Sequence, residues 1–484
     1  MAAIVPPMLR LEFDRGTLLL RTDPPPDGAG APRAPAPDLP GFTRDPRVGA
    51  WRAPALRYRD AVTALHRAGI EFEDGARGYR ELELRSRLER TPYPHQSEAV
   101  EAWWTGGRRG VVVLPTGAGK TYVAQLLIER AGRSTLIVTP TLDLMQQWYG
   151  ALATAFDADI GLVGGGYYDV RPLTVTTYDS AWLHMERFGD RFGLLVFDEC
   201  HHLPGPSYAF AAEAAIAPFR LGLTATPERE DGGDARYPEL IGPVVYRREI
   251  GDLAGRYLAD YETERLTVRL SPAEREEYRR ERALYRAFVA RHGIRFGSPA
   301  GWGRFLMLTS RSEEGRRAFL AYRRQKAIAE ASEAKLRLLG RLLERHRRHR
   351  VLVFTADNDT VYRISRRFLI PAITHQTRVK ERHRTLQRFN AGDLPFLVTS
   401  KVLNEGVDVP AASVGVVLSG SGSVREHVQR LGRILRRGEG KRAVLYEVVA
   451  EDTAEELTSD RRRRHSAWSA RRAAGRERAR GADR

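Results

Sequence analysis

The chain of 484 residues has very little cysteine and lysine and no long apolar run. Its single cysteine, Cys200, excludes an intramolecular disulfide and a cysteine-rich zinc site, and it fits a reducing compartment. No window of about 18 apolar residues occurs, so a membrane-spanning segment is not expected. The first residues also lack the apolar stretch of a secretory signal. The sequence therefore predicts a cytoplasmic protein without a membrane partner.

Acidic residues are outnumbered, which gives a formal net charge of +17. Only six of the 78 basic residues are lysine, so 72 are arginine. The segment 461–484 has ten arginines against Glu477 and Asp483, a net +8, and the preceding 460 residues carry the other +9. Such an excess indicates a polyanionic partner such as nucleic acid. Arginine-rich codon usage explains the arginine-to-lysine ratio equally well, but it explains the basic excess less well.

The first 85 residues are expected to form a small α+β domain. Two short apolar runs, 8–13 and 17–21, flank Asp14-Arg15-Gly16, which is typical of a hairpin. The segment Pro24–Pro40 has seven prolines in 17 residues and predicts an extended loop.

After this domain, short apolar runs alternate with amphipathic stretches, as in buried parallel strands joined by helices. Two such series predict two α/β domains, at 86–248 and 249–455. The predicted strands are 110–114, 135–138, 173–176, 194–197 and 220–223, then 351–354, 372–374, 396–399, 414–418 and 443–449. Residues 271–342 are charged and mostly helical in pattern. The segment 456–484 has no apolar periodicity and is expected to be a disordered basic tail.

A phosphate-binding loop is predicted at Leu114–Thr121, because it follows a strand and opens a helix. Glycines let backbone N–H groups close around phosphates, and the helix N-terminus favours negative charge. Lys120 would reach the β and γ oxygens, and the Thr121 hydroxyl would hold Mg²⁺. Leucine stands at 114, where the strict pattern has its first glycine.

An acidic pair, Asp198-Glu199, follows the strand 194–197 and lies 78 residues after Lys120. Asp198 at a strand end can hold Mg²⁺, and Glu199 can orient or deprotonate the attacking water. Cys200 is expected to pack. His201 is a possible metal ligand, but a coupling contact with the segment 224–226 is preferred.

A third motif contains Gln429, Arg433 and Arg436, which share one face of a predicted helix at i, i+4 and i+7. Two guanidiniums on that face could reach a γ-phosphate across a cleft between domains, where fingers of this kind are worth roughly 10³–10⁵ in rate. A solvated basic helix is the alternative.

Together these segments resemble superfamily 2 helicases. The segments 220–226 and 228–232, the latter with Arg229-Glu230-Asp231, look like the XPB helicases, and the resemblance covers roughly residues 8–455. It implies an α/β fold of two RecA-like parallel-sheet domains in tandem. It also implies a damage-recognition-like N-terminal domain and a helical, thumb-like insert at about 271–324. The proline-rich loop departs from the family pattern, and so does Cys200.

The resemblance also implies residue roles. Gln96 matches the adenine-reading glutamine, whose amide can donate to and accept from a base edge. The remaining nucleotide-binding residues would be Thr116, Gly117, Ala118, Gly119, Lys120, Thr121 and Asp408. Strand phosphates would be gripped by Thr139, Thr141, Thr177 and Thr399. Arg229, Glu230 and Asp231 would serve duplex opening, with a surface salt bridge as the alternative.

Aromatic residues in the insert leave two interpretations open. Phe296, Trp302 and Phe305 lie among Arg291, Arg295 and Arg304, which suits base stacking with phosphate contacts. The same rings could equally pack the insert.

The sequence is thus interpreted as a nucleoid-associated prokaryotic DNA translocase and helicase that uses ATP and Mg²⁺. By resemblance, it would move 3′ to 5′ and open single-stranded and forked DNA in nucleotide excision repair. An RNA helicase of the same superfamily is one alternative. A DNA-stimulated ATPase scaffold that recruits a nuclease is another.

Overall fold

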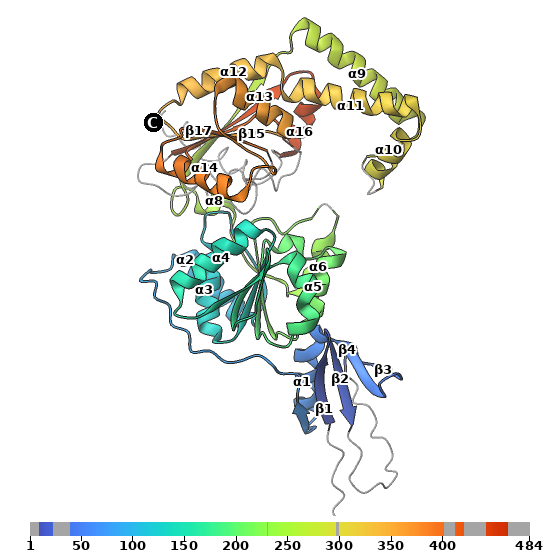
Figure 1. The fold of residues 1–484 in the computed structure, drawn as a ribbon, viewed down its shortest axis with the longest axis vertical. Coiled ribbons are helices and arrows are strands. Elements are labelled where there is room, and N and C mark those ends of the chain that lie inside the picture. The colour runs from blue at the N-terminus through green and yellow to red at the C-terminus, as the bar shows by residue number, and fades with distance from the viewer. Residues whose placement is uncertain are drawn as a thin grey trace, which may run out of the picture. The chain divides into compact units, whose positions relative to one another are not determined.

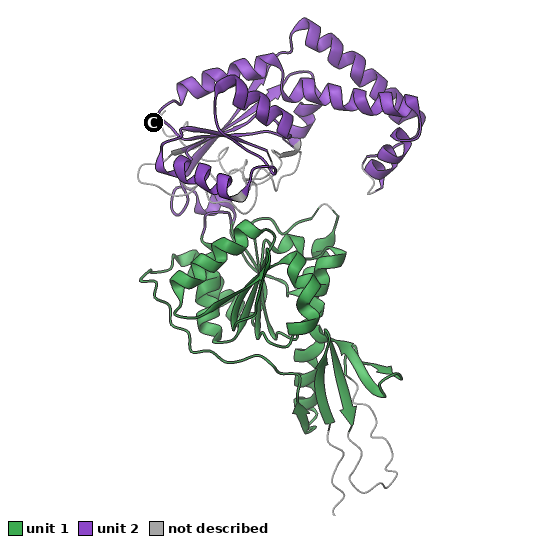
Figure 2. Cartoon of the chain, in the orientation of Figure 1, with its two compact units in different colours: residues 1–114, 119–248 green, residues 115–118, 249–484 purple. Residues whose placement is uncertain are grey.

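The computed structural model describes residues 9–22, 39–229, 231–296, 300–400, 412–420 and 442–462 (Figure 1). These residues belong to two compact units (Figure 2). One contains residues 1–114 and 119–248, and the other contains residues 115–118 and 249–484. Every helix in the described ranges is too short or too polar to cross a membrane.

The first unit begins with a small sheet in the order β3-β4-β2-β1-β5. Its elements are β1 (Leu9–Asp14), β2 (Thr17–Thr22), β3 (Thr43–Asp45), β4 (Ala50–Pro54), η1 (Ala55–Arg57), α1 (Tyr58–Arg67) and β5 (Phe72–Asp74). The predicted hairpin is confirmed, because β1 and β2 pair antiparallel with Asp14 opposite Thr17. Arg15 and Gly16 have φ values of 46° and 83°. Positive φ at both positions is what a type I′ turn requires.

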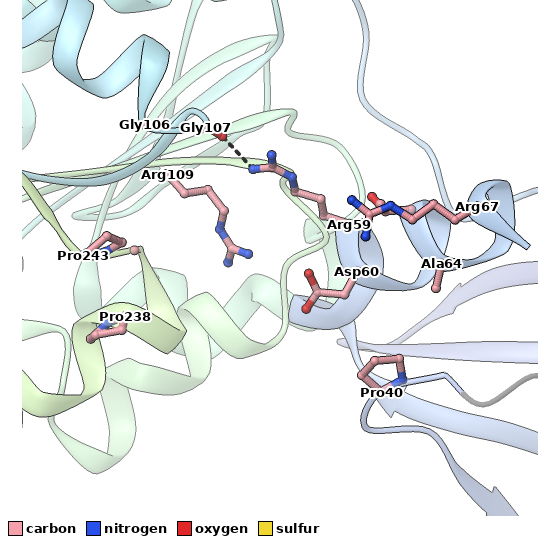
Figure 3. Close-up of a pocket in the computed structure, with 12 residues that line it drawn as sticks. Pro40, Arg59, Asp60, Ala64, Arg67, Gly106, Gly107, Arg109, Pro238 and Pro243 are labelled. Atoms are coloured by element: carbon pink, nitrogen blue, oxygen red, sulfur yellow. Dashed lines mark hydrogen bonds between the residues drawn. The ribbon is translucent and has the colours of Figure 1, made fainter.

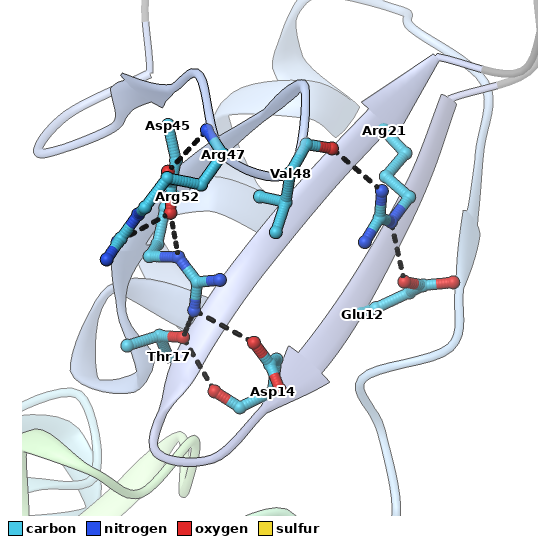
Figure 4. Close-up of polar contacts among 8 residues, drawn as sticks. All are labelled: Glu12, Asp14, Thr17, Arg21, Asp45, Arg47, Val48 and Arg52. Atoms are coloured by element: carbon cyan, nitrogen blue, oxygen red, sulfur yellow. Dashed lines mark hydrogen bonds and ion pairs between the residues drawn. The ribbon is translucent and has the colours of Figure 1, made fainter.

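Arginine–carboxylate contacts fix the small sheet (Figure 4). Asp45 accepts hydrogen bonds from Nε of Arg47 and Nε of Arg52, each at 2.9 Å. Arg52 Nη1 also donates to Asp14 Oδ2 at 2.9 Å, which joins β4 to the hairpin turn. The hydrogen bond from Arg47 holds the pKa of Asp45 well below its usual range.

This small domain shares a core with the domain that follows. Buried Leu11, Leu18 and Leu65 cluster with Ile216, which comes from the larger domain. Arg59 of α1 donates from Nη1 to the Gly107 carbonyl oxygen at 2.7 Å. Apolar packing and a polar tie therefore join the two domains within one unit.

The large sheet of the first unit has the order β13-β6-β12-β11-β7-β10-β8-β9. Its strands are β6 (Arg109–Val113), β7 (Thr135–Thr139), β8 (Ile160–Gly164), β9 (Tyr167–Asp169), β10 (Leu173–Thr177), β11 (Leu194–Asp198), β12 (Phe219–Thr224) and β13 (Val244–Arg247). All neighbours pair parallel except β8 and β9. All five strands predicted for this domain are confirmed to within about one residue at each end.

Helices cover both faces of this sheet, with α2, α3 and α4 on one side and α5 and α6 on the other (Figure 1). The helices are α2 (Pro94–Thr105), α3 (Lys120–Ala131), α4 (Leu142–Ala155), α5 (Tyr178–Phe188), η2 (Cys200–His202), α6 (Pro206–Glu213), η3 (Gly233–Arg236) and α7 (Tyr237–Leu240). Because both faces are covered, strands such as β7 and β11 are buried along their whole length.

Arg220 of β12 is a fully buried cation within this sheet. Its guanidinium donates to main-chain carbonyl oxygens of Ala212, Ala215, Ala217 and Leu240 at 2.6–3.1 Å. Burial lowers its pKa well below the usual value. The side chain ties the ends of α6 and α7 to the sheet without an acidic partner.

The second unit has a parallel sheet in the order β14-β19-β18-β15-β17-β16. Its strands are β14 (Asp260–Val268), β15 (Val351–Phe354), β16 (Ala372–Ile373), β17 (Phe396–Thr399), β18 (Val414–Val417) and β19 (Arg442–Ala450). The helices described outside the insert are α8 (Ile250–Leu253), α12 (Glu333–Arg345), α13 (Asn358–Phe368), α14 (Val379–Ala391) and α16 (Ala454–Arg462). The tandem α/β fold predicted from the sequence is confirmed. The predicted series of strands omitted β14.

The predicted helical insert consists of α9 (Pro272–Arg291), α10 (Gly301–Thr309) and α11 (Glu313–Glu330). Figure 1 shows α9 and α11 side by side, with α10 at the end away from the sheet. Phe305 is fully buried and packs in a small apolar core with Phe288 and Ala318. Phe296 and Trp302 are 41% and 42% exposed. Packing therefore accounts for Phe305, while the other two rings remain accessible.

The expectation of a disordered tail from residue 456 is wrong for its first residues, because α16 extends to Arg462. Lys335 is fully buried and its Nζ lies 2.7 Å from Glu455 Oε2. Arg265 Nη1 lies 2.8 Å from Asp460 Oδ1. These long-range contacts, invisible in the local pattern, fix the helix. Residues 463–484 and most of the proline-rich loop lie outside the described residues.

The base of the insert contains an acid with a shifted pKa. Glu330, at the end of α11, is 6% exposed, and its Oε1 lies 3.6 Å from Lys326 Nζ. Burial raises its pKa from 4.5 to about 7, although Lys326 opposes the shift. The folded state therefore binds more protons than the unfolded state between pH 4.5 and 7, and its stability falls as pH rises through that window.

Glu330→Gln should abolish this pH dependence and stabilise the protein at pH 8 by up to about 3 kcal/mol, since one pKa unit is worth about 1.36 kcal/mol. Thermal unfolding followed by circular dichroism at pH 4.5 and pH 8 measures the difference. The exposed Glu344 supplies a matched control, Glu344→Gln. Equal thermal midpoints for wild type and Glu330→Gln at pH 8 would contradict the assignment.

Candidate active site

The loop between β6 and α3 has the backbone that phosphate binding requires. Gly117 and Gly119 have φ values of 88° and 90°, in the region that favours glycine. A Cβ atom at residue 119 would lie 2.2 Å from Gln96 Nε2, so a side chain there would require the Gln96 amide to move. Lys120 and Thr121 are the first two residues of α3, where main-chain N–H groups are unpaired. Thr121 is exposed.

Lys120 lies next to the acidic pair, as the sequence predicts. Its Nζ donates to the Leu114 carbonyl oxygen at 3.3 Å and lies 3.7 Å from Glu199 Oε1. The two charged side chains are only 10% and 12% exposed, so water screens their attraction weakly. The loop and the end of β11 therefore converge on one site.

Asp198 is buried at the end of β11 and is held from two sides. Trp148 Nε1 donates to its Oδ2 at 2.7 Å, and the Glu199 backbone N–H donates to its Oδ1 at 3.0 Å. Burial, together with the neighbouring charge of Glu199, raises the pKa of Asp198 to about 6, although Lys120 and Trp148 oppose the change. A cation beside this carboxylate would favour its charged form. Trp148 lies 50 residues away in α4, and no motif in the sequence indicates its contact with Asp198.

Glu199 and His201 extend the site toward β12. Glu199 has a φ of 45°, unusual for a residue with a side chain, at the turn after the strand. His201 Nδ1 lies 3.1 Å from Thr224 Oγ1 and 3.5 Å from Glu199 Oε2. The predicted contact between His201 and the segment 224–226 is confirmed. Cys200 is fully buried, and burial raises the pKa of its thiol, which agrees with a packing role.

Gln96 lies against the phosphate loop. It is fully buried, and its Oε1 accepts a hydrogen bond from the Tyr93 backbone N–H at 2.9 Å within a capping box. Its amide nitrogen lies beside Gly119. Its role as the adenine-reading residue stays a prediction.

The threonines assigned to strand contacts divide into two kinds. Thr141 and Thr177 are the N-caps of α4 and α5, and their hydroxyls accept from the N–H of Leu144 and Ser180 at 3.2 Å. In contrast, Thr139 and Thr399 are fully buried, and their hydroxyls bond to main-chain carbonyl oxygens. The last two hydroxyls are therefore engaged within the protein, and a strand contact at Thr139 or Thr399 through the backbone N–H stays a prediction. The helix N-termini at Thr141 and Thr177 remain suited to phosphate.

Arg229 forms contacts within the protein. It donates from Nε to Asp231 Oδ1 at 2.8 Å and from Nη1 to the His201 carbonyl oxygen. The hydrogen bond from Arg229 also lowers the pKa of Asp231. The surface salt bridge considered as an alternative is thus present, and it is tied to the segment that follows Glu199.

For the other predicted site residues, the structure gives burial alone, or the residue lies outside the described ranges. Thr116 lies in the turn of the loop and is partly exposed, whereas Ala118 is buried. Glu230, Asp408, Gln429, Arg433 and Arg436 lie outside the described residues.

The residues near Lys120 fit a hard divalent cation. Asp198 offers a carboxylate and Thr121 a hydroxyl, the oxygen ligands that Mg²⁺ takes alongside substrate phosphates and water. Within the described ranges, no cluster of three or more His, Cys, Asp or Glu side chains could hold a metal ion. A metal centre built from protein ligands alone, including His201, is therefore not found in that part of the chain.

The comparisons with known families agree with this site. Residues 11–76 match the family described as xeroderma pigmentosum group B (XPB) helicase damage recognition domain. Residues 89–229 match the type III restriction enzyme res subunit, and residues 334–438 match the helicase conserved C-terminal domain. A solved structure, the Pyrococcus furiosus Hef helicase domain, shares the fold with a TM-score of 0.52 at 19% identity, covering 76% of this chain and 97% of that one. The fold and the phosphate loop thus define a protein of the helicase class.

Individual relatives show to which family of helicases the chain belongs. The chain is 40% identical over 424 residues to the DNA 3′-5′ translocase XPB2 of Sulfurisphaera tokodaii, covering 85% of this chain and 96% of that protein. It is 34% identical to the DNA 3′-5′ helicase XPB of Kineococcus radiotolerans and 32% identical to that of Mycobacterium tuberculosis, covering 77% and 74% of this chain. The chain belongs to the XPB helicase family. It spans only 62% and 60% of the two bacterial relatives.

Trp148→Phe should weaken the metal site, because it removes the hydrogen bond that holds Asp198 in its charged form. Loss of a partner to a metal ligand typically lowers metal affinity 10- to 100-fold. We therefore expect the Mg²⁺ concentration for half-maximal ATP hydrolysis to rise by roughly tenfold or more. Trp182→Phe, at a tryptophan 46% exposed on α5, is the control and should not change it. An unchanged Mg²⁺ requirement in Trp148→Phe would exclude this role.

Proposed function

We propose that the chain is an ATP-dependent DNA translocase that moves 3′ to 5′ and opens duplex DNA in nucleotide excision repair. The observation that carries this proposal is the convergence of Lys120, Asp198 and Glu199 behind a glycine loop, in a chain of the XPB family. The names of its relatives support the direction and the nucleic acid, because the XPB2 protein that it matches over most of its length is a DNA 3′-5′ translocase.

The proposed nucleotide is ATP. The glycine loop and the N-terminus of α3 would bind its phosphates, and Lys120 would exchange its contact with Glu199 for a phosphate oxygen. Mg²⁺, held by Thr121 and Asp198, would neutralise phosphate charge. Glu199 would then be free to orient the attacking water and accept its proton. Its Oε2 is covered and accepts no hydrogen bond among the described residues.

Coupling to DNA would follow a path through His201. One end of this path is Glu199, 3.5 Å from the imidazole, and the other end is the hydrogen bond between His201 Nδ1 and Thr224 Oγ1. The Arg229 guanidinium binds the His201 carbonyl oxygen and Asp231. A movement of the Glu199 side chain would therefore shift His201, whose carbonyl oxygen holds Arg229. The Arg229 guanidinium would then be released toward a DNA phosphate.

Several assignments stay proposals from the sequence. These are the arginine finger at Arg433 and Arg436, the supporting Gln429, the nucleotide contact of Asp408 and the duplex-opening role of Glu230. The domain limits at residues 85, 248 and 455 are proposals too, as are forked DNA and a nuclease as partners.

Lys120→Ala should reduce the rate of ATP hydrolysis at saturating DNA at least a hundredfold, because the phosphate charge loses its only cation from the loop. A coupled phosphate-release assay measures the rate. Lys380→Ala, at an exposed lysine on α14, is the control and should retain activity. Turnover near the wild-type rate in Lys120→Ala would refute the site.

The nucleic acid can be tested on the wild-type protein. We expect single-stranded and forked DNA to stimulate ATP hydrolysis more strongly than RNA of the same sequence, and the protein to displace a strand from a fork with a 3′ overhang. Stronger stimulation by RNA would favour the RNA helicase. DNA-stimulated hydrolysis without strand displacement would favour the scaffold that recruits a nuclease.

A further inference from the structure

The first unit contains a cavity of about 590 Å³ that the nucleotide site does not use. It lies between α1 of the small domain and the segments around β6 and β13 (Figure 3). Its charged lining consists of Arg59, Arg67 and Arg109 against a single carboxylate, Asp60. We call it the arginine cavity. Its remaining lining has no aromatic and no long apolar side chain, so it is poorly suited to a base or an apolar ligand.

Arg109 is the most constrained of the three arginines. Its Nε and Nη2 are covered by protein and have no hydrogen-bond partner among the described residues. Burial lowers its pKa. The nearby Asp60 is paired with Arg57, with 3.6 Å between Oδ2 and Nη1, and forms no ion pair with Arg109. A partly buried guanidinium with two covered nitrogens and no close counter-ion is unfavourable.

The neighbouring strand adds to this excess of positive charge. Arg109 of β6 pairs in register with Arg220 of β12, which is fully buried and bound only to main-chain carbonyl oxygens. The wall of the cavity therefore has a second guanidinium behind it and no second acid. An anion in the cavity would compensate both charges.

The cavity is also shaped before any ligand arrives. Arg59 is held by the Gly107 carbonyl oxygen at 2.7 Å (Figure 3). Gly242 packs against the backbone of Arg109, since a Cβ atom there would lie 2.6 Å from the Arg109 carbonyl carbon. Fixed donors lose little entropy on binding, which favours a specific anion site.

We propose that the arginine cavity binds a phosphate group. Planar guanidiniums with several donors match the oxygens of a phosphate group, to which they donate in pairs. The phosphate could come from the backbone of duplex DNA or from a small free phosphate compound. The DNA source rests on the proposed function, whereas the free source does not.

The first experiment measures binding of duplex DNA by fluorescence anisotropy at 50 and 200 mM salt. The variants are Arg67→Glu and Arg109→Gln, with Arg44→Glu, an exposed arginine of β3 outside the cavity, as the matched control. Loss of one phosphate contact lowers the slope of log affinity against log salt concentration by about 0.9. Between 50 and 200 mM salt, the loss of DNA affinity should therefore be about 3.5-fold smaller in a cavity variant than in wild type. Arg67 is exposed, so its variant tests the cavity even if Arg109→Gln folds poorly.

The second experiment titrates the wild type with inorganic phosphate at constant ionic strength and follows the thermal midpoint. A phosphate-dependent rise in wild type and Arg44→Glu, but not in the cavity variants, supports the proposal. If DNA binding is also altered in the cavity variants, the source is DNA, and if it is unchanged, the source is a free phosphate. Cavity variants that match Arg44→Glu in both titrations overturn the proposal. If wild type fails to bind DNA, the proposed function fails, and the phosphate titration alone decides the cavity.

Discussion

Burial of both faces of a parallel sheet is the constraint on which the rest of this structure depends. Strands whose side chains are covered on both sides leave polar chemistry only at their ends, and in a parallel sheet the carboxyl ends lie at one edge. The phosphate loop after β6, Asp198 at the end of β11 and Thr224 at the end of β12 are adjacent for that reason. The site thus results from strand order. Trp148 then binds the Asp198 carboxylate, and Gln96 lies against the phosphate loop at Gly119.

Cations inside this protein are held in two different ways. Lys335 has an acidic partner, Glu455, and links α12 to α16. Arg220 has carbonyl oxygens, and Arg109 has two covered nitrogens without a hydrogen-bond partner in the described part of the chain. The first arrangement pairs the positive charge with a negative one. The second leaves the positive charge without a close ion pair among the described residues, and it occurs where the small domain meets the larger one. Excess charge is therefore built into the interior of the first unit as well as its surface.

The sequence was informative where the signal was local. Continuous apolar runs predicted the buried strands, and the loop with its acidic pair predicted which residues converge at Lys120. It failed where tertiary contacts decide. The polar edge strand β14 and the glycine-rich β8–β9 hairpin have no apolar run, and α16 depends on Lys335 and Arg265. No sequence pattern indicated that Gln96 would be buried or that Trp148 would bind Asp198. Thr139 and Thr399 were assigned to strand contacts by resemblance, and their hydroxyls are buried.

The contact between Gly119 and Gln96 also limits how this protein can diverge. Any side chain at residue 119 would collide with the Gln96 amide, and the left-handed backbone there already disfavours one. A shorter residue at position 96 would remove this collision, but the unfavourable backbone conformation of residue 119 would remain. Conversely, a change at position 96 removes the support of the loop without disturbing its glycine. The two positions are therefore constrained differently. Residue 119 is constrained by its own backbone conformation as well as by Gln96, whereas residue 96 is constrained by its side-chain contacts alone.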